Sequence, residues 1–135
     1  MPLPDDGPSL AAGRTITFLY TEDLPRLAAF YEGALGLQCV VDQGACRILR
    51  ASATALIGLC AIPGRPRGTA GVLVSFAVAD VDAAVASLSA RGVAFEGPVT
   101  TGMGGKVRSA FFRDPEGYRL EIQSFLGKDG QPWFP

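Results

Sequence analysis

The sequence has no histidine among its 135 residues. Without an imidazole, the Ser-His-Asp and Cys-His systems of nucleophilic catalysis are excluded. The three cysteines are odd in number and lack CxxC spacing, so we expect neither a disulfide framework nor a structural zinc site. The chemistry of any site must therefore come from other side chains.

Long hydrophobic runs are also missing. The longest, residues 70–79, is about ten residues long, a length that suits a strand rather than a bilayer span. The N-terminal stretch MPLPDDGPSL is acidic and broken by proline, which is not the pattern of a secretory signal peptide. We therefore expect a soluble, cytoplasmic protein with no membrane partner.

Neither sign of charge dominates the chain. The formal net charge is −1, from 12 lysines and arginines against 13 aspartates and glutamates. No basic stripe favours nucleic acid, and no lysine-rich amphipathic helix favours a membrane surface. With 48% hydrophobic residues, the chain is long enough to bury the core of one compact domain. The expected partners are a small molecule and a second copy of the chain, with no nucleic acid.

What the sequence does contain is a pattern of short strands and one helix, which occurs twice. Residues 15–20, TITFLY, are rich in β-branched and aromatic residues and predict a strand. Asp23 suits a helix N-cap, Pro25 suits the first helical turn, and Gly36 suits the end of the helix. Further strands are predicted at residues 37–41, 46–51 and 55–62, before the segment PGRPRG.

The pattern begins again at residues 72–78, a nearly continuous apolar strand. Asp80 repeats the N-cap of the first helix, and Arg91 and Gly92 suit the C-terminus of a second helix. In DPEG, residues 114–117, proline at the second position and glycine at the fourth predict a type I turn. Further strands are predicted at residues 93–97, 106–113 and 118–125.

The order βαβββ, linker, βαβββ is an internal repeat of a whole supersecondary unit. Neither half can bury its apolar surface alone. We therefore predict an α+β fold in which two βαβββ modules form U-shaped mixed sheets around a cavity. The predicted single domain spans residues 15–126, with module one at 15–62, a linker at 63–70, module two at 71–126, and tails at 1–14 and 127–135.

Three segments resemble the vicinal oxygen chelate superfamily, which includes glyoxalase I, extradiol dioxygenases, fosfomycin-resistance enzymes and bleomycin-resistance proteins. They are DLPRLAAFYEGALGL at residues 23–37, FAVADVDAAVASLSARGV at 76–93 and FFRDPEGYRLEI at 111–122. The resemblance extends over residues 15–125, nearly the whole chain. It implies paired βαβββ modules, a homodimer, and a cavity inside each U-shaped sheet.

Metal-dependent members of that superfamily hold a divalent ion in the cavity, with ligands from the first, fifth and last strands. Glu121 matches the last-strand ligand, just after the DPEG turn. The first-strand position falls on Thr15 or Ile16 and the fifth-strand position on Leu73, and none of these is a good ligand. Because a catalytic metal site typically needs about three protein ligands, we predict no metal and no other cofactor, with a divalent ion as the alternative.

Glu121 alternates with Arg119 and Gln123 onto one strand face, which is expected to line the cavity. There it could contact a ligand, pair internally with Arg119, Arg108 or another arginine, or act as a general base or residual metal ligand. No residue is predicted to be catalytic, except Glu121 if the protein is an enzyme. The predicted ligand-binding residues are Glu121, Thr17, Cys46, Cys60, Leu73, Ser75, Arg108 and Arg119.

The cysteines allow two interpretations. If DQ turns the first hairpin, Cys39 lies opposite Cys46, and if SAT turns the next hairpin, Cys46 lies opposite Cys60. Such a row of thiols could hold a soft ion or react with an electrophilic ligand. Alternatively, the three residues pack as small apolar side chains in a crowded sheet.

These expectations favour a protein similar to the metal-free, drug-binding branch of the superfamily. It would bind or sequester a small apolar or aromatic molecule in its cavity, without turnover. The alternative is an enzyme, a glyoxalase-type lyase, isomerase or dioxygenase that uses Glu121 as base or metal ligand. A third possibility is a mainly structural or regulatory module whose cleft is filled by its own side chains. Stoichiometric metal would favour the enzyme, a cavity open to ligand the binding protein, and a collapsed cleft the third possibility.

Overall fold

The computed structural model describes residues 14–70 and 72–126, so the predicted tails, apart from Arg14, lie outside the described residues. The strands are β1 (Thr15–Tyr20), β2 (Gln38–Asp42), β3 (Cys46–Arg50), β4 (Ala55–Cys60), β5 (Leu73–Ala77), β6 (Thr100–Gly102), β7 (Val107–Arg113) and β8 (Arg119–Phe125). The helices are α1 (Leu24–Ala29), which continues into the π-helical turn η2 (Phe30–Ala34), α2 (Val81–Ala90) and the short 3-10 turn η3 (Met103–Gly105). None of these described helices has the length and apolar character needed to cross a membrane.

The first helix begins where the sequence predicts. Asp23 is its N-cap, and Oδ1 of Asp23 accepts a hydrogen bond from Arg26 N at 3.2 Å. Pro25 lies in the first turn, where its missing N–H has no intrahelical partner to lose. Gly36 follows the helical segment with φ +70°, a left-handed conformation that glycine adopts without a Cβ clash. Asp80 caps α2 in the same way.

The first half of the chain forms a four-stranded mixed sheet in the order β1-β4-β3-β2. β1 pairs parallel with β4, whereas the other neighbours pair antiparallel. Cys46 lies opposite Cys60, as predicted. The predicted pairing of Cys39 with Cys46 is wrong, because Cys39 lies opposite Leu49. The β2–β3 turn is longer than DQ alone, and the ladder is irregular between Cys39 and Val41, so β2 is shifted.

The second half repeats this arrangement in the order β5-β8-β7-β6, with β5 parallel to β8. The predicted type I turn is present, since Gly117 N donates to Asp114 O at 3.0 Å and Glu116 lacks the positive φ of a type II turn. The predicted strand at residues 93–97 is wrong. Only Phe95 forms an isolated bridge there, and the strand at that edge of the sheet is β6. Pro98 has no N–H to donate, so a ladder cannot run unbroken from Phe95 into β6.

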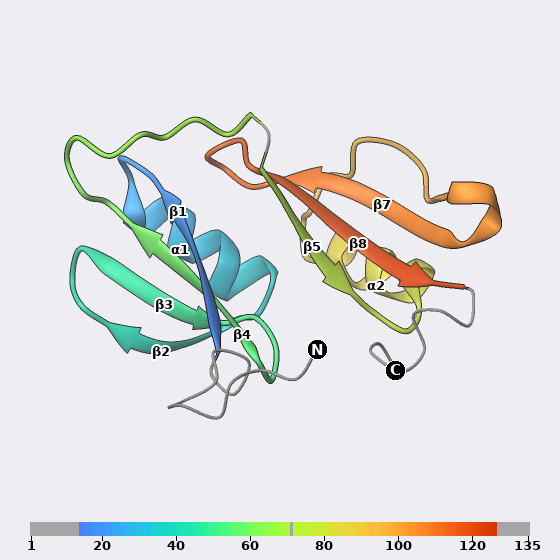
Figure 1. Ribbon diagram of the computed structural model, residues 1–135, viewed down its shortest axis with the longest axis horizontal. Coiled ribbons are helices and arrows are strands. Elements are labelled where there is room, and N and C mark those ends of the chain that lie inside the picture. Colours follow the sequence, from blue (N-terminus) through green and yellow to red (C-terminus); the bar gives the residue numbers. More distant parts are fainter. Residues whose placement is uncertain (1–13, 71, 127–135) are drawn as a thin grey trace, which may run out of the picture.

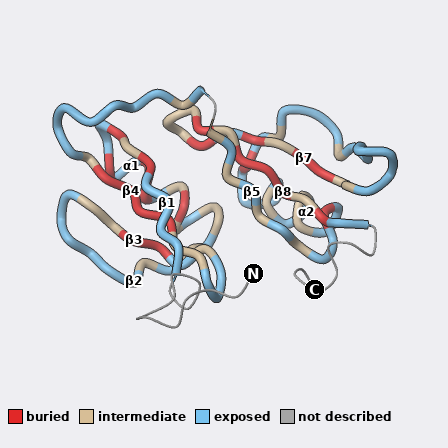
Figure 2. The backbone as a smooth tube through the Cα atoms, viewed as in Figure 1, coloured by how far each residue is buried: buried red, intermediate tan, exposed pale blue. Residues whose placement is uncertain are grey.

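The two sheets lie beside each other, and each helix covers one face of its own sheet (Figure 1). Buried residues gather in the strands and in α1, whereas residues 63–70 are largely exposed (Figure 2). One continuous core joins both halves, and its members include Leu19, Leu27, Tyr31, Leu59, Val81, Phe112, Leu120 and Ile122. This architecture confirms the predicted α+β fold with two βαβββ modules and mixed sheets.

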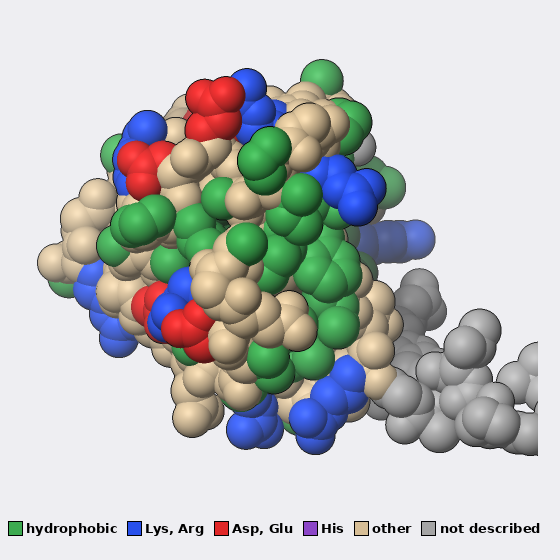
Figure 3. Space-filling view, turned by 90° about the vertical axis from the view of Figure 1, so that its left-hand side faces the viewer, with side chains coloured by type: hydrophobic (Ala, Val, Ile, Leu, Met, Phe, Trp, Pro, Cys, Tyr) green, Lys and Arg blue, Asp and Glu red, His purple; other side chains and the backbone are tan. Residues whose placement is uncertain are grey.

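Each sheet also has an open face, by which we mean the face turned away from its helix. Strand alternation places Phe18, Gly58 and Ile48 side by side on the open face of the first sheet. The Phe18 ring lies so close over Gly58 that a Cβ there would meet ring atoms at 2.5 Å. Figure 3 shows hydrophobic side chains gathered over this half of the molecule. The exposed large apolar residues of this half are Ile16, Phe18, Val40, Val41 and Ile62.

Candidate functional site

A cleft of about 790 Å³ opens between the two halves of the chain. The edge strand β5 forms one wall, and the β3–β4 turn with the first part of β4 forms another. Its volume falls within the range of roughly 300–1,000 Å³ that is usual for small-molecule sites. Three of the predicted ligand-binding residues, Thr17, Leu73 and Ser75, line it. The complete lining is Thr17, residues 51–57 and residues 72–78.

Glu121 lies one strand away from this cleft, on the open face of the second sheet. In the strand register it is opposite Ser75 of β5 and Phe111 of β7. Nε2 of Gln123 donates to Oε1 of Glu121 at 2.9 Å and to Oγ of Ser75 at 2.6 Å. Because Ser75 also lines the cleft, two hydrogen bonds connect the carboxylate to the cleft wall. Glu121 is only 8% exposed.

The β7–β8 turn decides which residues of β8 share this face. It pairs Arg113 with Arg119, and alternation from Arg119 then brings Glu121 onto the open face. Leu120 and Ile122 face the other way and are buried in the core. The predicted alternation is therefore confirmed. A turn longer or shorter by one residue would exchange the two sets of side chains.

Arg119 shares the open face with Glu121 but has other partners. Its Nε lies 3.3 Å from Oε2 of Glu96, and its guanidinium carbon lies 4.0 Å from the centre of the Phe111 ring. Arg113 also pairs with Glu96, at 2.9 Å. The positive charge beside Glu121 is thus shared with a second carboxylate and an aromatic face. The internal pair kept open for Glu121 and Arg119 does not form.

Arg108 lies on the opposite, helix-facing side of the second sheet. Its Nε and Nη2 each donate to the carboxylate of Asp82 on α2, at 2.7 Å. This bidentate pair lowers the pKa of Asp82 and raises that of Arg108. The structure therefore does not bring Arg108 together with Glu121. The expected ion pair between Glu121 and Arg108 is wrong. The partner of the Glu121 carboxylate is the amide of Gln123.

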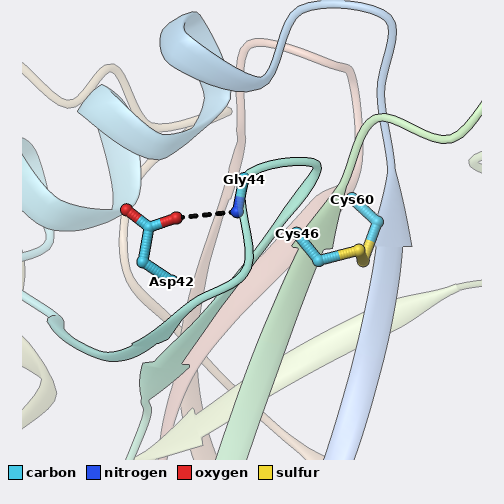
Figure 4. Close-up of a disulfide and its surroundings, with 4 residues drawn as sticks. All are labelled: Asp42, Gly44, Cys46 and Cys60. Atoms are coloured by element: carbon cyan, nitrogen blue, oxygen red, sulfur yellow. Dashed lines mark hydrogen bonds between the residues drawn. A yellow bond between two sulfur atoms is a disulfide. The ribbon is translucent and has the colours of Figure 1, made fainter.

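Cys46 and Cys60 lie on the open face of the first sheet, and their sulfur atoms form a disulfide (Figure 4). The sequence predicts neither a disulfide framework nor this single bond, which forms because direct cross-strand pairing brings the two Cα atoms to 4.1 Å. Cys39 is a free thiol that packs against the core on the helix-facing side. The predicted row of three thiols therefore does not form.

A buried hydrogen-bond cluster, which we call the joint, connects the β7–β8 turn to the first half of the chain. Oδ2 of Asp114 accepts from the Tyr31 hydroxyl at 2.8 Å, and Oδ1 accepts from the backbone N–H groups of Glu116 and Tyr118 at 2.9 Å each. The Tyr118 hydroxyl accepts from Tyr20 N at 3.2 Å. Burial is the largest cause that raises the pKa of Asp114, and it also raises that of Tyr31.

The protein-family model of the glyoxalase/bleomycin resistance protein/dioxygenase superfamily matches residues 14–122 of this chain. The chain belongs to this superfamily. No curated protein matches the sequence.

Solved structures of low sequence identity share the superfamily fold. A glyoxalase/bleomycin resistance protein/dioxygenase from Nocardioides is 23% identical, covers 96% of this chain and 92% of its own, and has a TM-score of 0.72. A lactoylglutathione lyase from Agrobacterium tumefaciens is 23% identical, with coverages of 92% and 98% and a TM-score of 0.65. A protein from the mobile metagenome of V. Pseudocholerae is 24% identical, with coverages of 84% and 94% and a TM-score of 0.66. At these identities the likeness extends to the fold.

The side chains around Glu121 do not fit the divalent ion that metal-dependent members of the superfamily hold. Its cross-strand neighbours are a hydroxyl, on Ser75, and an aromatic ring, on Phe111. Leu73, at the expected fifth-strand ligand position, is apolar. Within residues 14–70 and 72–126, no three carboxylate, thiol or imidazole groups come together in a way that could hold an ion. A single carboxylate with neutral neighbours is a weak site for such an ion.

The structure shows two groups of residues that sequence reasoning did not assign to the site. The sequence predicts the face of Gln123 but no role for it, although its amide links Glu121 to Ser75. The sequence predicts the β3–β4 turn, residues 51–54, only as a connection between strands, yet it lines the cleft. The alternation of polar residues along β8 could have indicated Gln123, whereas nothing in the sequence indicates which turn faces the other module.

Proposed function

We propose that this superfamily member binds and sequesters a small molecule that has an apolar or aromatic body and a hydrogen-bond donor. The cleft between the modules is the proposed site, and the proposed unit is a cytoplasmic homodimer with one such cleft in each chain. The observation that supports this most is the position of Glu121, a nearly buried carboxylate linked through Gln123 to Ser75 of the cleft wall.

The donor requirement follows from the chemistry of a carboxylate, which when ionised only accepts hydrogen bonds. Oε1 of Glu121 accepts a hydrogen bond from the side-chain amide of Gln123, whereas Oε2 accepts none from the residues that the structure describes. An N–H or O–H group of a ligand that extends from the cleft across β5 would supply the partner for Oε2. The apolar requirement follows from Leu73, which is 49% exposed in the cleft wall, and from the Phe111 ring beside Glu121.

A matched pair of aromatic probes tests this proposal by calorimetry on the tag-free protein. We expect 2-naphthylmethylamine, which carries a donor cation, to bind more tightly than 2-naphthoate, which carries an acceptor anion. Glu121→Gln should weaken binding of the amine about tenfold, since a hydrogen bond to a charged group is worth about 1.5–3 kcal/mol and about 1.4 kcal/mol is tenfold in affinity. Binding of the naphthoate should change little.

The control is Asp82→Asn, which removes a carboxylate from the helix-facing side and should leave both affinities unchanged. Equal binding of both probes, or equal losses in the two variants, would contradict the role of Glu121. The enzymatic alternative is separated by elemental analysis of the same protein. Close to one transition metal per chain would favour the glyoxalase-type lyase or dioxygenase, and close to none agrees with sequestration.

A further inference from the structure

The disulfide between Cys46 and Cys60 joins neighbouring strands at a position that the backbone already holds. On one side of the pair, Arg47 lies opposite Leu59 in the β3–β4 ladder. On the other side, the ladder continues, since Ala61 N donates to Ala45 O at 2.8 Å. Backbone pairing on both sides keeps the two residues opposite each other without the sulfur–sulfur bond. Reduction would therefore leave two thiols facing each other.

The turn next to the pair is also held by bonds that do not involve sulfur. Gln43 N donates to Cys46 O at 2.8 Å, and Oδ1 of Asp42 accepts from Gly44 N at 3.0 Å (Figure 4). On the other side of β4, Thr21 N donates to Cys60 O at 3.0 Å. Each cysteine thus keeps its backbone partner whatever the oxidation state of the sulfur.

The two sulfur-bearing residues differ in access from solvent. Cys60 is 1% exposed, because it lies on a central strand between β1 and β3. Cys46 is partly exposed, because it lies at the start of β3, next to an exposed turn. Thiol–disulfide exchange requires an attacking thiolate to reach one sulfur along the bond. Only Cys46 meets that requirement well.

We propose that Cys46 and Cys60 form a reversible dithiol–disulfide couple, with Cys46 as the site of mixed-disulfide formation with small thiols. A small thiolate attacks Sγ of Cys46, the bond to Cys60 breaks, and Cys60 leaves as a thiolate that takes a proton. A second small thiolate then attacks the mixed disulfide and releases Cys46. Two electrons pass from the two small thiols to the protein, which gains two protons, while the small thiols become one disulfide.

The reverse direction uses the same geometry. A small disulfide is attacked by the accessible thiolate of Cys46, and one half of it leaves as a thiol. Cys60, held directly opposite, then attacks Cys46 and expels the second half. Cys39 cannot act as the resolving cysteine, because it packs on the helix-facing side of β2, away from Cys46 and Cys60. This couple gives the superfamily fold a modification site on the apolar open face of its first module.

The experiment follows thiol content in folded protein. The wild type is incubated in glutathione buffers of graded redox potential, and free thiols are then alkylated with iodoacetamide. Mass spectrometry gives the number of alkylated cysteines, while circular dichroism monitors the fold. We expect two cysteines to change together and reversibly, with unchanged circular dichroism. A bond that stays closed until the protein unfolds would overturn the proposal.

Three variants assign the parts of the couple. With oxidised glutathione, Cys60→Ser should trap one adduct on Cys46, and Cys46→Ser should form an adduct on Cys60 at least about tenfold more slowly, since access controls exchange. Cys39→Ser is the control and should behave like the wild type. An adduct on Cys60 or Cys39 in preference to Cys46 would overturn the assignment. If Cys60→Ser does not fold, the wild-type titration alone decides whether the couple is reversible.

Discussion

The two modules share one backbone plan but present opposite chemistry on their open faces. In the first, Phe18 of β1 lies beside Gly58 of β4. In the second, Ser75 of β5 lies beside Glu121 of β8, at the corresponding place in the repeat. This row is thus apolar in the first module and polar in the second, although the strand order and the parallel pairing are the same. The fold supplies two equivalent platforms, and the side chains of one row decide which platform carries the polar site.

The corresponding hairpin turns of the modules differ as well. The β7–β8 turn inserts Asp114 and Tyr118 into the joint with the first module. The β3–β4 turn makes no such contact with the other module and lines the cleft. Its hydrogen bonds stay within the first module, as from Ala55 N to Ser52 Oγ and from Thr15 N of β1 to Thr54 O. The repeat is therefore asymmetric in energetics, since one turn fixes the module arrangement and the other remains beside the proposed ligand.

The largest expected effect comes from breaking the joint. Asp114→Ala leaves the Tyr31 hydroxyl and two backbone N–H groups without their acceptor and should lower the free energy of unfolding by about 3 kcal/mol. Ser52→Ala, at the exposed turn of the other module, should cost less than about 0.5 kcal/mol. Urea unfolding of both variants measures the difference. Equal losses would mean that the two turns are equivalent after all.

A smaller effect is expected from making the first open face resemble the second. Phe18→Ser places the residue type of Ser75 beside Gly58. Because the ring is 44% exposed, its loss should cost only about 1 kcal/mol of unfolding free energy. Binding of a hydrophobic dye to the folded protein should fall in the same variant. A loss of several kcal/mol would show that the ring belongs to the core rather than to an exposed face.

The smallest effect is the pH dependence that Asp114 contributes. Burial raises its pKa in the folded protein above the ordinary value of about 3.9. As the pH rises, Asp114 therefore keeps its proton to a higher pH in the native state than in the unfolded state. The free energy of unfolding falls through this pH range. Relative to Asp114→Asn, the wild type should lose unfolding free energy as the pH rises from about 4 and should level off above the raised pKa.

Urea unfolding of both proteins across this range measures the effect. The Asn variant is a matched control because it keeps an oxygen for the backbone N–H groups of the turn. A constant difference between the two proteins would mean that Asp114 titrates as it does in the unfolded chain.

The secondary structure could be predicted largely because its signals are local. The caps at Asp23 and Asp80 and the DPEG turn each act within a few residues, and the structure confirms them. The face of Glu121 followed from the same turn, since alternation needs only a fixed starting point. Repetition of the pattern then indicated the two-module fold.

What could not be predicted depends on register and on distant partners. The irregular register between Cys39 and Val41 places Cys39 opposite Leu49 instead of Cys46. No residue type in β2 predicts such a bulge. Arg108 was a candidate for the site because it is an arginine on a strand, but its face depends on the register with β8. The contact of Tyr31 with Asp114 spans 83 positions in sequence, beyond the reach of any local pattern.

The parallel pairing of β1 with β4 and of β5 with β8 sets the order in which the chain can fold during synthesis. β1 must wait for residues 55–60, but the first sheet can then close before β5 has left the ribosome. β5 waits in turn for β8, so each module completes itself only with its last strand. The joint needs Asp114 and Tyr118, so it forms late. We therefore expect folding to end with burial of the shared core between two modules whose strands are already paired, a non-local step that is slow relative to hairpin formation.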